Sequence, residues 1–156
     1  PTHPPPTPPT PLSIHDALPI WKILKLLTNL QLSQKQFDIV IDRINAELKS
    51  SPDDEELKLL LTKAYLTENN IDSAKDTLQD VIDNNSVSEE PYLALARIQL
   101  SQDERAQAEA TLENGYTNVK NNRQILGVLT EFQIQDKKFD VVETIVKDAL
   151  SVAQED

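Results

Sequence analysis

A period of 34 residues runs through most of this 156-residue chain, and few folds are compatible with it. Apolar or small side chains recur at this interval in three sets: Leu27, Leu61, Leu95 and Leu129; Val40, Ala74, Ala108 and Val142; and Ile44, Leu78, Leu112 and Val146. A fixed period of this length indicates a repeat solenoid, in which each unit buries its apolar face against its neighbours. We therefore divide residues 21–156 into four units, which are 21–54, 55–88, 89–122 and 123–156.

The apolar spacing inside a unit predicts two helices. In the second unit, one helical face contains Leu57, Leu60, Leu61, Ala64 and Tyr65. A polar break at 67–70 follows, and a second helical face then contains Ile71, Ala74, Leu78, Val81 and Ile82. Ser51 and Ser88 precede two of the predicted first helices, and we expect them to act as N-caps.

Composition excludes several classes of function. The formal net charge of −11 disfavours binding to a phosphate backbone, so nucleic acid is not an expected partner. No apolar run approaches the roughly 20 residues that span a bilayer. The chain has no cysteine, and its only histidines are His3 and His15, so thiol nucleophiles and the usual zinc ligands are missing from the repeats. We predict no catalytic residues, no metal and no cofactor.

The first 20 residues differ in kind from the rest. Eight of the ten prolines lie in residues 1–19, and residues 12–20 read LSIHDALPI. This stretch resembles one reading frame of a sequencing adapter, LSLHDALPI, so we interpret residues 1–20 as a disordered, artefactual head. A Pro-rich linker or a ligand for aromatic-lined grooves are the alternatives. With the true N-terminus then missing, both cytoplasm and periplasm remain open as the compartment.

The repeats resemble the tetratricopeptide repeat family over residues 21–156. The resemblance rests on Tyr92-Leu95-Ala96 and Leu61-Thr62-Tyr65 in first helices, on Ala74-Leu78 and Ala108-Leu112 in second helices, and on Phe37, Phe139 and Pro52. It implies an all-α, right-handed solenoid of four antiparallel helix pairs whose first helices line a concave face. Two kinds of departure are present, charged residues at apolar positions (Lys58 and Arg105) and glutamine in place of tyrosine (Gln31, Gln99 and Gln133).

By this resemblance, certain positions of each first helix face a partner-binding groove. The candidate groove residues are Lys25, Asn29, Leu32, Leu59, Lys63, Leu66, Leu93, Arg97, Leu100, Glu131 and Ile134. In one interpretation they hold an extended segment or helix of another protein, with apolar affinity and a basic row for carboxylates. In the other, the leucines pack between neighbouring helices and the charges are solvated. The family's carboxylate clamp is not expected, because Lys25 and Asn29 match it but Leu60, Glu90 and Ala94 do not.

The expected function is a protein-interaction scaffold that binds a protein or peptide, as a fragment of a larger bacterial repeat protein. Two alternatives remain open. The chain could be the docking arm of an enzyme or sensor whose catalytic domain is missing. It could also self-associate through uncapped ends, because Val141, Ile145 and Val152 lie on a last helix that has no successor.

Overall fold

Within residues 20–120 and 122–152, which the computed structural model describes, the chain forms eight α-helices and no strand. The helices are α1 (Ile20–Ser33), α2 (Phe37–Leu48), α3 (Glu55–Glu68), α4 (Ile71–Asp83), α5 (Glu90–Ser101), α6 (Arg105–Asn118), α7 (Arg123–Gln135) and α8 (Phe139–Val152). The prediction of an all-α solenoid built from helix pairs is confirmed. The Pro-rich and adapter-like stretch of residues 1–19 lies outside the described residues.

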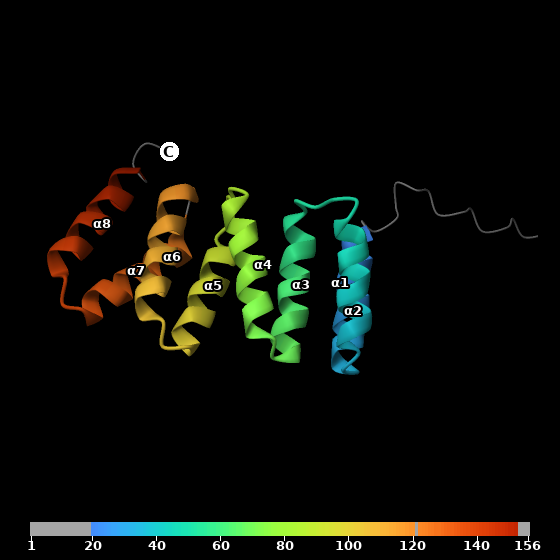
Figure 1. Ribbon diagram of the computed structural model, residues 1–156. Helices are drawn as coiled ribbons and strands as arrows, with labels where there is room; N and C mark the ends of the chain where they lie inside the picture. Colours follow the sequence, from blue (N-terminus) through green and yellow to red (C-terminus); the bar gives the residue numbers. More distant parts are fainter. Residues whose placement is uncertain (1–19, 121, 153–156) are drawn as a thin grey trace, which may run out of the picture.

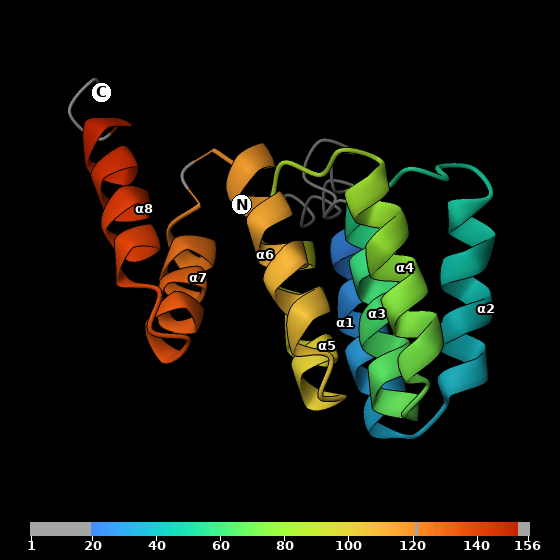
Figure 2. The same cartoon turned by 60° about the vertical axis from the view of Figure 1, so that its left-hand side comes forward.

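The helix pairs stack in chain order, with α1 and α2 at one end and α8 at the other (Figure 1). In the turned view, α8 and α2 lie at the two extremes and α1 lies next to α3 (Figure 2). The second helices α2, α4 and α6 each pack against their own first helix and against the first helix of the next unit, which is α3, α5 and α7 respectively, whereas α8 packs against α7. In addition, α1 contacts α3 and α5 contacts α7. Most helices are therefore covered by neighbours on two sides, as a solenoid requires.

The hydrophobic core has two parts. One cluster joins Val40 and Ile44 of α2 to the apolar face of α3, and it also includes Leu32 of α1. A larger cluster extends from Ala74 and Leu78 of α4 across α5 and α6 to α7. Ala74 and Ala108, the small residues of the repeat pattern, are fully buried where helices pack closely.

The turns between the two helices of each unit share one backbone feature. Lys35, Asn69, Asp103 and Lys137 all have positive φ, between 58° and 67°, and they are spaced by 34 residues. This left-handed region strains most side chains, asparagine and aspartate least, and glycine adopts it without strain. The 34-residue period is therefore present in the backbone angles as well as in the apolar side chains.

The prediction that Ser51 and Ser88 cap two first helices is wrong, because other residues stand at the N-cap positions of α3 and α5. Asp54 is the N-cap of α3, and its Oδ1 accepts a hydrogen bond from the Leu57 amide at 3.0 Å. Glu89 precedes α5 without capping it, and its carboxylate instead accepts hydrogen bonds from the first turn of α7, at 2.9 Å from the Gln124 amide. The Ser88 hydroxyl donates to Glu55 Oε1 at 2.7 Å. The Glu89 carboxylate thus connects the third unit to the fourth, and the Ser88 hydroxyl joins the end of the second unit to the start of α3.

The charged departures from the family pattern are accommodated by pairing. The buried side chain of Lys58 places its Nζ 2.5 Å from Asp80 Oδ2 on α4. The guanidinium of Arg105 lies 4.4 Å from the centre of the Phe132 ring and pairs with Asp136 at 2.9 Å. The charges of both long side chains are thus compensated by acidic partners, and that of Arg105 also by an aromatic ring.

The glutamines that replace tyrosine link helices by hydrogen bonds. Gln31 Oε1 accepts from Arg43 at 2.7 Å, and Gln99 Oε1 accepts from the Thr111 hydroxyl at 2.9 Å, so each connects the two helices of its own unit. Gln133 Nε2 donates to Glu109 Oε1 of the preceding unit at 2.7 Å. All three glutamine side chains are buried, and these hydrogen bonds compensate for part of that burial. Among the described residues, Gln133 Oε1 is buried without a hydrogen-bond partner.

Candidate functional site

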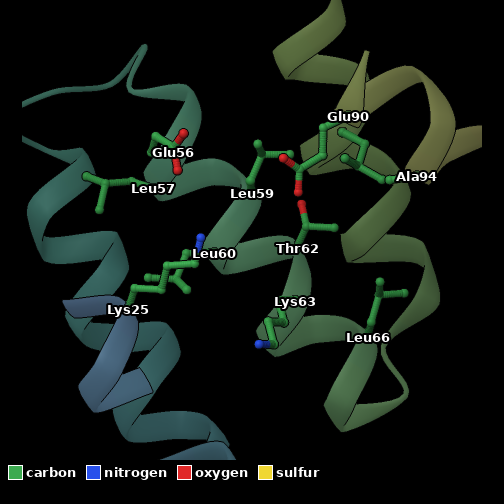
Figure 3. Close-up of a pocket in the computed structure, with 11 residues that line it drawn as sticks. Lys25, Glu56, Leu57, Leu59, Leu60, Thr62, Lys63, Leu66, Glu90 and Ala94 are labelled. Carbon is green, nitrogen blue, oxygen red and sulfur yellow. The ribbon is translucent and has the colours of Figure 1, made fainter. Parts of the chain in front are cut away.

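A cavity of about 240 Å³ opens between three first helices, α1, α3 and α5 (Figure 3). Most of its lining comes from α3, which contributes Glu56, Leu57, Leu59, Leu60, Thr62, Lys63 and Leu66. The helix α1 adds Lys25, α4 adds Leu78, and α5 adds Glu90 and Ala94. The cavity wall is therefore mostly apolar, with charged side chains at its rim.

The rim charges have opposite signs at different places along the cavity. Glu56 and Glu90 lie where α3 and α5 begin, and negative side chains are favourable at the positive end of a helix. Lys63 lies two turns further along α3 (Figure 3), and its Nζ donates to Asn29 Oδ1 of α1 at 2.6 Å. The Lys63–Asn29 bond links equivalent positions of the first and second units and holds the lysine beside the cavity.

The structure brings some of the predicted groove residues together. Lys25, Leu59, Lys63 and Leu66 line the cavity, and Asn29 contacts it through its bond to Lys63. Leu66 is 38% exposed, so part of its side chain is open to solvent, whereas Leu59 is half-buried against the larger core cluster. These five residues lie in or beside one cavity, and a role for them in binding stays a prediction.

The other predicted residues do not line this cavity. Leu32 and Leu93 are buried in the two core clusters, and Leu100 is half-buried against the larger one, so for these three the packing interpretation fits better. Arg97, Glu131 and Ile134 are exposed on α5 and α7. The predicted apolar row is therefore interrupted, because leucines at equivalent positions of the repeat differ in exposure.

Several cavity residues were not among the candidates. Glu56 and Glu90 stand at groove-facing positions of the repeat. They were not chosen as candidates because their place at helix starts already accounts for an acidic residue there. Leu57, Leu60 and Leu78 belong to the apolar packing faces, and the repeat register alone does not indicate that their edges reach a cavity. Thr62 and Ala94 complete the lining.

A second cavity, of about 310 Å³, lies where the α4–α5 loop meets α6. Its lining is mostly polar and includes Asn85, Asn114 and Asn118. The Tyr92 hydroxyl donates to the Ser86 carbonyl at 3.2 Å, and burial raises the pKa of Tyr92. No predicted groove residue lines this cavity.

The described residues also bear on two other classes of site. None of the described helices has the length and apolar character needed to cross a membrane. Over the same part of the chain, histidine, cysteine, aspartate and glutamate side chains do not gather in groups of three or more that could hold a metal ion.

Comparison with known proteins identifies the family. The family described as the tetratricopeptide repeat-like domain matches residues 24–121, which is more than half of the chain. The chain belongs to this family. No curated protein matches it significantly. Tetratricopeptide repeat-like domains are in general scaffolds for protein–protein interaction, and they are typically non-catalytic.

Proposed function

We propose that this tetratricopeptide repeat-like chain binds a segment of a partner protein in the cavity between α1, α3 and α5. The observation that carries the proposal is an apolar cavity between first helices whose rim bears charges of both signs. Apolar side chains of a partner would contact Leu59, Leu60 and Leu66, and the release of water from this surface supplies affinity. Nothing in this binding mode requires a cofactor.

The arrangement of charge favours a partner segment of mixed charge. A basic side chain would lie beside Glu56 and Glu90, and an acidic one would lie further along the cavity beside Lys63. Such complementarity contributes more to specificity and orientation than to affinity, because rim charges remain exposed to solvent. We expect a dissociation constant on the order of micromolar, about −8 kcal/mol.

The experiment uses 12-residue peptides selected from a random displayed library on the intact chain. Their binding is then measured by fluorescence anisotropy to the chain and to its Leu66→Asp variant. We expect Leu66→Asp to weaken binding at least about tenfold, because it places a carboxylate in the apolar wall. Circular dichroism should show that helicity is kept, since Leu66 is partly exposed.

Ile134→Asp is the matched control. Ile134 stands at the equivalent position of the fourth unit and is 47% exposed, but it does not line the cavity. Selected peptides should bind this variant as they bind the parent chain. If they bind Leu66→Asp with unchanged affinity, the proposed site is wrong. Leu100→Asp is less informative, because Leu100 packs partly into the core and its substitution would disturb the fold.

A further inference from the structure

The first helix, α1, exposes a continuous apolar face. Ile23, Leu26, Leu27 and Leu30 lie on one side of α1, and their exposed fractions range from 37% to 65%. Their spacing of i, i+3, i+4 and i+7 is that of a helix face that packs against another helix. A large exposed apolar patch of this kind marks an interaction surface.

The repeat shows which kind of helix fits this face. One period later, the equivalent residues of α3 are Leu57, Leu60, Leu61 and Ala64, and all four are buried. They belong to the same core cluster as Val40 and Ile44 of α2, which packs directly against α3. The apolar face of α1 is therefore built to receive a second helix of the α2 type.

The last helix carries the matching face. Phe139, Val142, Val146 and Leu150 of α8 stand at the positions of Phe37, Val40, Ile44 and Leu48 of α2. Three of the four residues are identical, and the fourth changes isoleucine to valine. In α2 this face packs in the core cluster with α3, whereas in α8 the side chains of Phe139, Val146 and Leu150 are exposed.

Charge favours the pairing of these two faces. The sequence of α1 contains two lysines and no acidic residue, and it is the only one of the eight helices with a net positive charge. The sequence of α8 contains three acidic residues and one lysine. In a chain with a net charge of −11, most other pairings of its surfaces would bring like charges together.

We infer that α8 of one copy packs against α1 of a second copy, so that the solenoid continues from chain to chain. The new contact repeats the α2–α3 contact inside the chain, with the same residue types on the second-helix side. The helices α1 and α8 lie at opposite ends of the molecule (Figure 1), so the contact is head to tail. A head-to-tail contact leaves each end free to add another copy.

Sedimentation equilibrium on the intact chain tests this inference. The weight-average mass should rise above the 17.5 kDa of one chain as its concentration is raised to about 1 mM. Leu26→Asp blocks only the α1 face and Leu150→Asp blocks only the α8 face, and each variant alone should remain at 17.5 kDa. In an equimolar mixture, the unaltered α8 face of Leu26→Asp can pair with the unaltered α1 face of Leu150→Asp. The mixture should therefore form a dimer that cannot add a third chain.

The controls separate a specific contact from other causes. Val87→Asp changes a side chain that is 76% exposed in the α4–α5 loop, away from both faces, and should leave the association of the chain unchanged. Circular dichroism monitors the folding of each variant. If Leu26→Asp or Leu150→Asp loses helicity, Leu30→Asp on α1 and Phe139→Asp on α8 replace them in the same experiment. A chain that stays monomeric at about 1 mM overturns the inference. So does self-association of Leu150→Asp alone, which would indicate pairing of two α1 faces.

Discussion

The second helices of the third and fourth units, α6 and α8, occupy the same place in the repeat but differ in burial. Counting valine, isoleucine, leucine and phenylalanine as large apolar residues, α6 contains one, Leu112. Even so, Ala108, Leu112 and Gly115 of α6 are all buried. The described part of α8 contains six such side chains, and none of them is buried. α6 packs between α5 and α7, whereas α8 packs against α7. In a solenoid, burial thus depends on having neighbours on both sides, and an apolar sequence alone does not ensure it.

The largest expected effect comes from truncating one equivalent pair of residues. Leu112 is fully buried, and Val146, one period later, is 40% exposed. Leu112→Ala should lower the free energy of unfolding by about 2–5 kcal/mol, because it leaves a cavity between α5, α6 and α7. Val146→Ala should cost less than about 1 kcal/mol. Urea denaturation at low concentration, where copies do not meet, measures both; equal losses would contradict the comparison.

Adding one methyl group at each of the two glycines should change the stability of the chain by a smaller amount, and in opposite directions. A Cβ at Gly115 of α6 would lie 2.8 Å from Ile125 Cδ1 and 2.8 Å from Tyr92 Cγ. Gly115→Ala should therefore destabilise the chain by about 1–3 kcal/mol. A Cβ at Gly127 of α7 would meet nothing within 4 Å, so Gly127→Ala should stabilise by about 0.5–1 kcal/mol through helix propensity. Thermal denaturation of the two variants measures both changes in stability. If the midpoint moved in the same direction for both variants, the contacts of the added methyl group would not determine whether it stabilises or destabilises the chain.

The period predicted the helix pairs because it records packing faces that every unit shares. It did not predict which groove residues are open, since exposure depends on the neighbouring unit. Leu32, Leu66 and Ile134 share one repeat position, yet Leu32 is buried while Leu66 and Ile134 are exposed. Likewise, Ser88 was expected to cap its own helix. Instead its hydroxyl donates to Glu55 at the start of α3, a connection that local sequence does not reveal.

The left-handed turns give an effect that should not depend on the neighbours. Asp103 and Lys137 have φ of 62° and 58° in the third and fourth units. Lys137→Gly should stabilise by about 0.5–1 kcal/mol, because glycine removes the strain of positive φ but costs some entropy. Asp103→Gly and Asn69→Gly should change stability less, because aspartate and asparagine tolerate this conformation. A gain at Asp103 without a gain at Lys137 would show that even the turn energies depend on burial.

The smallest expected effect depends on pH and concerns the contact of α6 with the fourth unit. A hydrogen bond from Lys138, and a second one from Gln133, lower the pKa of Glu109 below its ordinary value of 4.5. Because the folded-state pKa is lowered, this pair stabilises the fold above the ordinary pKa. That contribution is lost as the pH falls through the lowered folded value.

Glu109→Gln removes this titration and keeps the size of the side chain. The stability difference between the parent chain and the variant should be under about 1 kcal/mol at neutral pH, because Glu109 is partly exposed, and it should shrink towards acidic pH. Denaturation curves at several pH values measure it. A difference that stays constant as the pH falls would mean that Glu109 joins the units through shape and not through charge.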